Sequence, residues 1–296
     1  MPRRWLFALA LAVVARALPA TAQADTTPIV VAGAGGASTS LAAPARRIVS
    51  LAPHLTELLF AAGAGDRVVG ASAWSDYPPA ARAIPRIGDS HAFDIERIVA
   101  LRPDLVVAWD AGNAPRHLAR FRRLGIPVHV EGAARLDDIG AALERLGRLA
   151  GTAPVAHEAA QRYRQRLAAL REGHASLAPV RVFHQVWDEP LMTINGQHPV
   201  SDLIAACGGE NAFAGAPALA PVVSREAVLR AAPAVITAAA ADDGSDPFAA
   251  WRRWAGLPAL ANGLLVALPA DAISRLSPRL LDAAEPLCEA IATARR

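Results

Sequence analysis

Short apolar runs alternate with helical stretches in the first half of the chain. The helical stretches begin with residues 53–60, which stop at Gly63, and continue with residues 94–101. The apolar runs between and around them cover residues 48–51, 68–70, 105–109 and 128–130. Strands that alternate with helices in this way predict a parallel sheet that is covered on both faces.

The second half of the chain repeats a pattern of the first half. Residues 96–108 and 226–238 start 130 positions apart and share a leading glutamate, a proline and a final alanine. A second echo links residues 61–67 with residues 205–211. We interpret these echoes as two similar α/β lobes, each a Rossmann-like unit with a parallel sheet.

Two helical stretches lie between the predicted lobes, at residues 136–149 and 153–171. The second stretch would form a helix about 28 Å long. We therefore divide the chain after the first 24 residues into an N-terminal lobe (25–150), a single long rigid linking helix (151–175) and a C-terminal lobe (176–296). A stiff spacer leaves a cleft between the lobes, and the loops at the strand ends would line it.

The first 24 residues predict export from the cytoplasm. An arginine pair precedes the apolar stretch 5–14, and Ala22-Gln23-Ala24 forms a small-residue cleavage site before Asp25. The alternative is a membrane anchor, but a membrane span needs about 20 apolar residues. We expect a cleaved signal peptide (1–24) and a soluble exported protein.

The charge balance changes once this segment is removed. All 30 basic residues are arginines, and they exceed the 27 acidic residues by three. Three of these arginines precede Asp25, so the mature chain carries no net charge and offers little support for a nucleic-acid partner. A hydrophobic content of 53% with 19% charged residues excludes a disordered chain.

The chain has two cysteines, Cys207 and Cys288. In an oxidising compartment they are candidates for a disulfide bond. The alternative that remains open is two buried free thiols.

Catalytic motifs are missing from the sequence. It contains no Gly-x-Ser-x-Gly, His-Glu-x-x-His, Cys-x-x-Cys or P-loop pattern, and its eight histidines are scattered without ligand spacing. We therefore expect neither an enzyme nor a resident cofactor or metal. His54 and His91 lie on loops that we place at the cleft, and they are the histidines that could contact a metal or a cofactor.

Aromatic residues occupy several of the predicted loops: Trp74, Tyr77, Trp109 and Trp187. Rigid aromatic rings suit an amphipathic planar ligand, because they bury a large area at low entropic cost. The alternative for each ring is a place in the core. Pro78-Pro79 stiffens the loop that carries the first two, which favours a binding site.

Glu96 and Glu226 occupy equivalent places in the two halves. Each follows a candidate helix N-cap, Asp94 or Ser224, by two residues. Stabilisation of the helix dipole is one explanation. The other explanation is docking. Because the two positions are equivalent, one exposed carboxylate on each lobe could bind an arginine of a partner with two-fold symmetry.

Seven segments form a set of motifs within a region of similarity that runs from about Arg46 to Cys288. They are Arg47-Ile-Val-Ser-Leu-Ala-Pro53, Thr56-Glu57, Ser75-Asp-Tyr-Pro-Pro79, residues 96–107, Cys207-Gly-Gly-Glu-Asn211, Val223-Ser-Arg-Glu226 and Ser277-Pro-Arg279. This set resembles the periplasmic vitamin B12-binding family of ABC uptake systems. The Pro-Asp-Leu-Val strand is shared with a wider class that binds haem and ferric siderophores. The Ser-Asp-Tyr-Pro-Pro and Cys-Gly-Gly-Glu-Asn motifs resemble more narrowly the cobalamin binders.

The resemblance implies a class III periplasmic binding fold, with two lobes, one linking helix and little lobe closure. Cobalamin or a related corrinoid would be the transported ligand and not a cofactor. The protein would be a monomer in the periplasm, and it would deliver the ligand to a dimeric inner-membrane permease and its ATPase.

The resemblance also implies roles for individual residues. By position, Tyr77 and Trp109 would contact the corrin, and Trp74 and Asp271 would lie beside them. The two glutamates of the repeat, Glu96 and Glu226, would meet arginines of the permease. The two cysteines fall where the family has its disulfide.

The sequence departs from the family at four positions where aromatic residues are expected: Ser90, Met192, Ala220 and Ala272. Trp187 would compensate for part of the loss. The nearest alternative is the same fold with haem or a ferric siderophore, and Tyr77, His54 or His91 would then supply the axial ligand of haem. A secreted metal-dependent enzyme is the alternative from another class.

Overall fold

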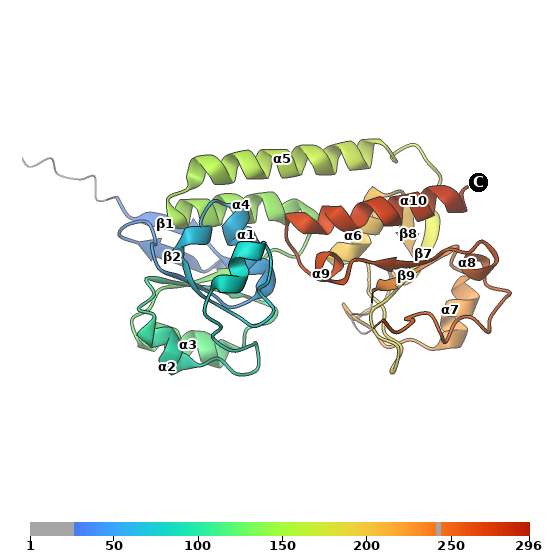
Figure 1. Ribbon diagram of the computed structural model, residues 1–296. Helices are drawn as coiled ribbons and strands as arrows, with labels where there is room; N and C mark the ends of the chain where they lie inside the picture. The colour runs from blue at the N-terminus through green and yellow to red at the C-terminus, as the bar shows by residue number, and fades with distance from the viewer. Residues whose placement is uncertain (1–26, 241–243) are drawn as a thin grey trace, which may run out of the picture.

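The computed structural model describes residues 27–240 and 244–296, so the predicted signal peptide lies outside the described residues. The described chain forms two lobes that a layer of helices joins along one side (Figure 1). It begins with an antiparallel hairpin of β1 (Ile29–Ala32) and β2 (Ser38–Leu41). Across these ranges, every helix is too short or too polar to cross a membrane.

A four-stranded parallel sheet forms the centre of the N-terminal lobe. Its order is β4-β3-β5-β6. The elements are β3 (Ile48–Ser50), β4 (Val68–Ala71), β5 (Leu105–Trp109), β6 (Val128–Glu131), α1 (Pro53–Ala61), α2 (Ile95–Ala100) and α3 (Pro115–Arg123). The central strands β3 and β5 bury all their side chains except Trp109, which is half-buried. Burial on both faces explains why these strands read as continuous apolar runs.

The C-terminal lobe has a sheet of the same kind. Its order is β10-β9-β7-β8, with parallel pairing throughout. The elements are β7 (Val180–Gln185), β8 (Gly209–Asn211), β9 (Val235–Ala239), β10 (Leu265–Leu268), α6 (Pro199–Ala206), α7 (Arg225–Ala231), α8 (Pro258–Ala261), α9 (Ala270–Ile273) and α10 (Ala284–Ala294). Short 3-10 helices occur in both lobes. Three lie on the N-terminal side, at Ala34–Gly36, Gly65–Arg67 and Pro79–Ala83, and one lies on the C-terminal side, at Pro278–Ala283.

The two sheets are wound in the same way. Numbered within each lobe, the strands follow the order second, first, third, fourth in both sheets. The echoed segments 96–108 and 226–238 cover equivalent pieces: α2 followed by β5, and α7 followed by β9. The predicted architecture of two parallel-sheet α/β lobes is therefore confirmed.

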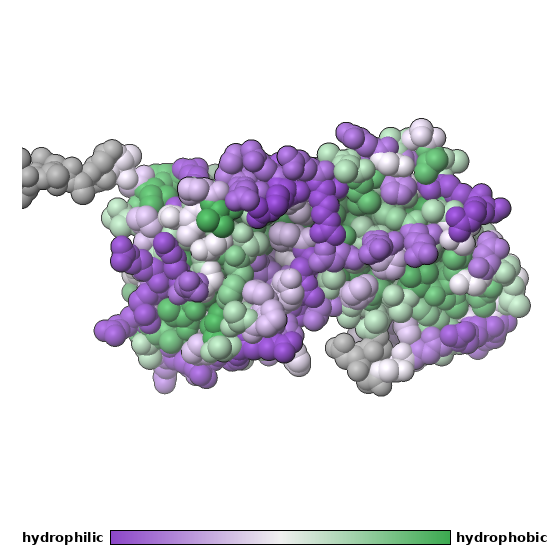
Figure 2. Space-filling model, turned by 45° about the horizontal axis from the view of Figure 1, so that its top comes forward, coloured by the Kyte–Doolittle hydropathy of each residue, from purple (hydrophilic) through white to green (hydrophobic). Residues whose placement is uncertain are grey.

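The helical layer consists mainly of α4 (Leu136–Ala150) and α5 (Ala153–Glu172), which pack against each other. Between them, Gly151 takes the left-handed conformation (φ 67°) that ends α4 and reverses the chain. Figure 1 shows α5 running along the top from one lobe to the other. Its inner side buries Tyr163 and Leu167, and the surface above it is hydrophilic in Figure 2.

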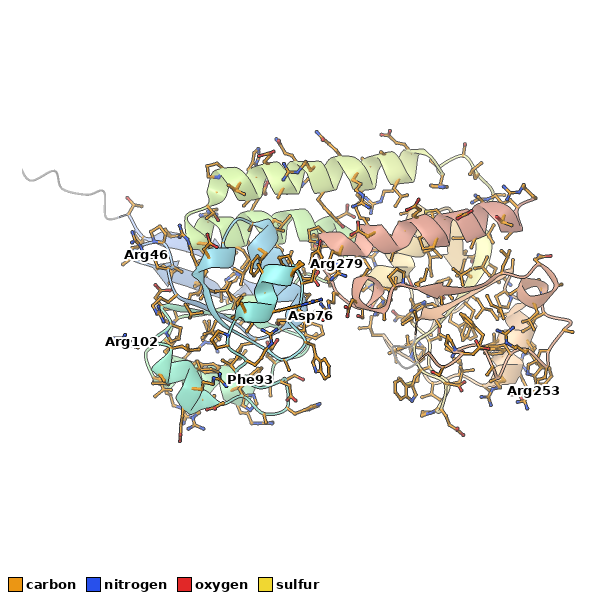
Figure 3. The ribbon with its side chains drawn as sticks, in the orientation of Figure 1. Arg46, Asp76, Phe93, Arg102, Arg253 and Arg279 are labelled. Carbon is orange, nitrogen blue, oxygen red and sulfur yellow. A yellow bond between two sulfur atoms is a disulfide. The ribbon has the colours of Figure 1, made fainter. Side chains whose placement is uncertain are left out.

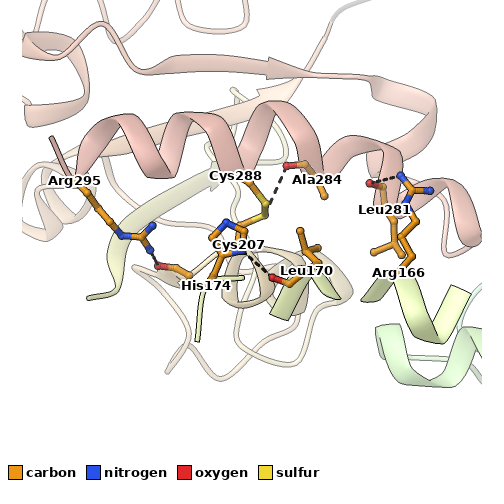
Figure 4. The surroundings of a disulfide bond; sticks show 9 residues. Arg166, Leu170, His174, Cys207, Leu281, Ala284, Cys288 and Arg295 are labelled. Atoms are coloured by element: carbon orange, nitrogen blue, oxygen red, sulfur yellow. Dashed lines mark hydrogen bonds between the residues drawn. A yellow bond between two sulfur atoms is a disulfide. The ribbon is translucent and has the colours of Figure 1, made fainter. Parts of the chain in front are cut away.

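A disulfide bond joins Cys207 and Cys288, as expected. Cys207 ends α6 and Cys288 lies in α10, so the bond ties two helices of the C-terminal lobe together (Figure 4). It closes a loop of 81 residues. The alternative of two free thiols is wrong.

Candidate ligand-binding cleft

A cavity of about 720 Å³ lies between the lobes. Residues that follow β3 and β5 line one wall, and the start of α6 with the segment from α9 to residue 280 lines the other. The chain leaves the adjacent strands β3 and β5 toward opposite edges of the sheet, because β3 connects to β4 and β5 connects to β6. Open α/β sheets bind ligands at the carboxyl ends of strands where the order reverses in this way. The cavity therefore occupies the place that the fold favours for a ligand.

Asn113 joins the ends of the two central strands. It is buried, its side-chain oxygen accepts a hydrogen bond from the Trp109 backbone N–H at 2.7 Å, and its amide donates to the Leu51 carbonyl at 3.3 Å. Loops at strand ends are usually mobile, but here both ends are held by one side chain. This wall of the cavity is therefore preformed.

Trp109 lies on this wall and packs against His54. The ring centroids are 5.0 Å apart, with an edge-to-face angle of 83°. A Cβ at Gly112 would come within 2.0 Å of the indole, so only glycine leaves room for the ring there. Burial lowers the pKa of His54 to about 4, which keeps the imidazole neutral above pH 5. Both rings therefore present an uncharged surface to the cavity.

Trp74 also lines the cavity, and 76% of its surface is exposed. Its backbone has a φ of 64°, a conformation that is uncommon for a bulky residue and needs support from its surroundings. The hydroxyls on either side supply that support. Ser72 and Ser75 contact each other at 3.1 Å, and Thr56 of α1 donates to Ser75 at 3.1 Å. A buried hydroxyl cluster thus fixes the chain on both sides of the exposed Trp74.

Tyr77 lies beside the cavity. The cavity-lining residues of the described chain do not include it. Instead, the Arg279 guanidinium of the other lobe stacks over its ring, 3.8 Å from the centroid. Figure 3 shows Arg279 and Asp76, the neighbour of Tyr77, at the junction of the two lobes. The structure thus brings Tyr77 into contact between the lobes.

Trp187 follows the carboxyl end of β7 and is 63% exposed. Its indole N–H donates to the Glu189 carbonyl at 3.0 Å. Within the described ranges it is not among the residues that line the cavity. The exposed Val222 lies near it, because the backbone of Met192 pairs with both Trp187 and Val222.

Asp271 lines the cavity from α9, and Arg275 holds it there with a hydrogen bond of 2.8 Å from Nη2 to Oδ1. The Nη1 atom of Arg275 also donates to Glu57 at 3.0 Å and to Asp76 at 2.8 Å, and both belong to the N-terminal lobe. Arg279 adds a hydrogen bond to Glu57 at 2.8 Å. We call these five residues the interlobe ion cluster.

The charges of the interlobe ion cluster support one another. Burial by itself would raise the pKa of Asp76, but the hydrogen bond and positive charge of Arg275 outweigh it and lower that pKa. Burial alone would lower the pKa of Arg275, and its hydrogen bonds to Asp76 and Glu57 raise it instead. The contacts of the cluster therefore favour the charged forms of Asp76 and Arg275.

Three histidines, His54, His91 and His198, lie on the cavity wall. The spacing of the histidines gives no sign that His198 belongs to a site, because it is one of eight scattered histidines. It caps α6, because its Nδ1 accepts from the Val200 backbone N–H at 3.2 Å, and burial lowers its pKa to about 4. Across residues 27–240 and 244–296, His, Cys, Asp and Glu side chains form no group of three or more that could hold a metal ion.

The positions that lack the expected aromatic residues are spread over different surroundings. Ser90 lines the cavity and, with His91 and Arg116, also an adjoining polar recess of about 410 Å³. Ala272 is buried in α9. Met192 pairs with Trp187 through their backbones. The small Ser90 side chain therefore leaves space in the wall of the cavity.

Glu96 and Glu226 lie exposed in the first turns of α2 and α7. Both helices are capped as the sequence suggests. The Asp94 carboxylate accepts a hydrogen bond from the Arg97 backbone N–H at 2.9 Å, and the Ser224 hydroxyl accepts one from the Ala227 backbone N–H at 3.2 Å. A hydrogen bond from its own backbone N–H, with one from Ser224, lowers the pKa of Glu226. Figure 1 shows α2 and α7 on the side of the molecule opposite α5.

Comparison with known proteins supports this arrangement. The vitamin B12-binding protein of Vibrio cholerae is 42% identical over 246 residues, which cover 83% of this chain and 88% of that protein. A crystal structure of the periplasmic vitamin B12 binding protein of Vibrio cholerae aligns with a TM-score of 0.78 and 40% identity, covering 86% of this chain and 99% of that one. The apo form of a periplasmic heme-binding protein from Roseiflexus aligns with a TM-score of 0.74 and 27% identity, covering 85% and 99%.

These likenesses identify the two-lobed arrangement as the class III periplasmic binding fold, as the sequence motifs suggest. The model of one protein family matches residues 48–272, from β3 to α9. This match covers both sheets and most of the residues that line the cavity. The chain therefore belongs to the periplasmic binding protein family.

Proposed function

We propose that this protein is the substrate-binding component of an ABC importer and that it captures cobalamin or a related corrinoid in the interlobe cleft. The observation that carries the proposal is the cavity between the lobes, into which Trp74 and Trp109 present their indoles. The relatives named for vitamin B12 binding support the same ligand. The protein acts in the periplasm as a monomer, binds the ligand as cargo and catalyses no reaction.

The chemistry of the cavity suits a corrinoid. A corrin is a broad and nearly flat ring with amide side chains at its edge. The indoles of Trp74 and Trp109 offer apolar faces to such a ring, and the neutral His54 keeps the adjoining wall uncharged. The Asp271 carboxylate can accept hydrogen bonds from the peripheral amides.

Tyr77 and Trp187 contact the outer part of the ligand in this proposal. Tyr77 follows the cavity-lining Trp74 by three residues, and Trp187 follows the carboxyl end of β7, the edge of the sheet at which the family of folds binds its ligands. The exposed indole of Trp187 then takes over area that the missing aromatic residues would supply.

Delivery of the ligand uses the two glutamates. The lobes, residues 25–150 and 176–296 on either side of the linking helix, each contribute one exposed carboxylate, Glu96 or Glu226, on the side away from α5. Two arginine-bearing sites of a dimeric permease, with its ATPase on the cytoplasmic side, match this arrangement.

Haem is the second candidate ligand, because His54, His91 and His198 all line the cavity. A neutral imidazole can ligate iron without first losing a proton. A ferric siderophore belongs to the same alternative. The heme-binding relative from Roseiflexus shares the fold at lower identity than the relatives named for vitamin B12.

Competition between the two ligands tests the proposal. The purified mature protein is dialysed against equal concentrations of cyanocobalamin and haemin, and the retained ligand is identified from its absorption spectrum. Retention of cyanocobalamin supports the proposal. A retained haem spectrum that His54→Ala or His198→Ala weakens would replace it with haem binding.

A further inference from the structure

Glu57 is a buried carboxylate that receives donors from the opposite lobe. It lies in α1 and is 4% exposed. Its Oε1 accepts hydrogen bonds from Arg275 Nη1 at 3.0 Å and Arg279 Nη1 at 2.8 Å, and its Oε2 accepts one from the buried Ser277 hydroxyl. The three donors are 218 to 222 residues away in the sequence. These contacts join the first helix of one lobe to the segment around residue 278 of the other.

Glu57 is close to the cavity but not part of its wall. The lining residues of the described chain include His54 of the same helix, and they do not include Glu57. A substitution of Glu57 therefore removes no direct contact with a ligand in the cavity. Any effect of such a substitution on ligand binding has to act through other residues.

Arg275 links Glu57 to both sides of the cleft. One end of its guanidinium binds Glu57 and Asp76, and Asp76 lies two residues after the cavity-lining Trp74. The other end binds Asp271, which lines the opposite wall. Arg279 makes two further contacts with the N-terminal lobe. It donates a hydrogen bond to Glu57, and its guanidinium stacks on the Tyr77 ring. Glu57 is thus the buried carboxylate that both guanidiniums of the opposite lobe share, and the Asp76 and Tyr77 contacts lie beside it.

A buried charge that loses its partner is much less stable than a buried pair. If the lobes moved apart, Glu57 would lose both guanidiniums and the Ser277 hydroxyl at once. The ion pairs therefore oppose opening of the cleft. Without Glu57, Arg275 still has two carboxylates, but neither of them anchors it to α1.

We propose that Glu57 is a positioning residue, which fixes the spacing of the Trp74 loop and Asp271 across the cleft and keeps the lobes of the empty protein at the separation that the ligand requires. The part of this inference that concerns the ligand rests on the proposed function. The part that concerns the lobes does not.

The substitution Glu57→Gln keeps the size of the side chain and removes its charge. Glu131→Gln is the matched control, because Glu131 is also buried and also binds an arginine, Arg145, at 2.7 and 2.9 Å. That pair joins β6 to α4 on the N-terminal side and does not reach the C-terminal sheet. Both variants lose a buried carboxylate, and only one loses a contact between the lobes.

The separation of the lobes can be measured directly with spin labels. Ala119 in α3 and Arg230 in α7 are exposed positions on the two lobes, and both native cysteines are in a disulfide, so Ala119→Cys and Arg230→Cys accept the labels selectively. Pulsed electron paramagnetic resonance gives the distance distribution between the labels, without ligand and with cyanocobalamin. Affinity for cyanocobalamin is measured on the unlabelled variants.

We expect Glu57→Gln to broaden the distance distribution of the ligand-free protein, and cyanocobalamin to narrow it again. If the fraction of molecules whose lobes have the separation that the ligand requires falls to about a tenth, the apparent Kd for cyanocobalamin rises about tenfold. Glu131→Gln should leave the distribution and the Kd within twofold of wild type. Arg279→Gln, which removes one guanidinium at a less buried site, should shift both quantities in the same direction as Glu57→Gln.

An unchanged distance distribution in folded Glu57→Gln, or in Arg279→Gln if the first variant does not fold, would overturn the inference. A broader distribution with an unchanged Kd would also overturn it, because the lobes would then be free without consequence for the ligand. Absence of cyanocobalamin binding in wild type would contradict the proposed function alone, and the ligand-free distances would still decide the role of Glu57.

Discussion

The imidazole of His54 meets the indole of Trp109 edge to face, with ring centroids 5.0 Å apart. The contact joins residues at the carboxyl ends of the neighbouring strands β3 and β5, and Asn113 holds the same two strand ends together. Burial keeps His54 neutral, so the pair forms an uncharged wall that exists before a ligand arrives.

Replacement of Trp109 by alanine should weaken cyanocobalamin binding. The indole lines the cavity, and the loss of one aromatic contact costs about 1 kcal/mol or more, which is about a fivefold increase in Kd. Calorimetric titration measures the change. Trp254→Ala is the control, since this indole packs against the core of the C-terminal lobe and should leave the Kd unchanged. Equal affinity of wild type and Trp109→Ala would remove Trp109 from the binding site.

The free energy of unfolding should fall as the pH is lowered from 7.5 to 5. Burial lowers the pKa of His184 to about 3, whereas an unfolded histidine titrates near 6.5, so the unfolded chain takes up a proton first as the pH falls. Stability is therefore full above pH 6.5 and declines below it, by about 1 to 2 kcal/mol at pH 5 for this residue.

Denaturant unfolding at the two pH values checks this prediction. His184→Asn can keep the contact with Thr237, which is 2.9 Å from the imidazole in the native protein, and it should show a smaller loss between pH 7.5 and 5. The same pH dependence in the variant and in wild type would mean that His184 is not the group responsible.

Loss of the disulfide should destabilise the C-terminal lobe without changing the cleft. The bond between Cys207 and Cys288 closes a loop of 81 residues, and the loop-entropy model then assigns it about 4 to 5 kcal/mol. The double variant with serine at both positions should unfold at lower denaturant concentration and bind cyanocobalamin with the wild-type Kd at 25 °C. A weakened Kd in the folded variant would show that the bond also shapes the cleft.

The double substitution Glu96→Ala and Glu226→Ala should abolish delivery of the ligand to reconstituted transporter and leave the affinity for the ligand unchanged. Each single variant should retain part of the delivery, because one docking contact remains. Glu158→Ala with Glu172→Ala, on the α5 side of the molecule, serves as the control pair. Full delivery by the first double variant would contradict docking through these carboxylates.

Much of the fold could be predicted from the sequence, because its determinants are local. The apolar runs 48–51 and 105–109 match the buried strands β3 and β5, and the proline or N-cap residues mark where helices begin. The repeat at 96–108 and 226–238 predicts that the two sheets are alike, since similar patterns of apolar residues and helix breakers fold into similar units.

Less of the site could be predicted, because it depends on contacts between distant segments. Glu57 and Arg275 are 218 residues apart, and no local pattern indicates that they pair. Another contact between distant segments places the Arg279 guanidinium over the Tyr77 ring. His198 was missed as a cavity residue, although its place directly before Pro199, at the start of a helix near the cleft, was a usable signal.

The central claim is that the interlobe cleft binds a corrinoid. The most direct test is a calorimetric titration of cyanocobalamin into the mature protein that begins at Asp25. We predict binding of one molecule per protein with a Kd of about 1 μM or below, corresponding to about 8 kcal/mol. Absence of heat and of binding by equilibrium dialysis would contradict the claim and direct the search to haem and siderophores.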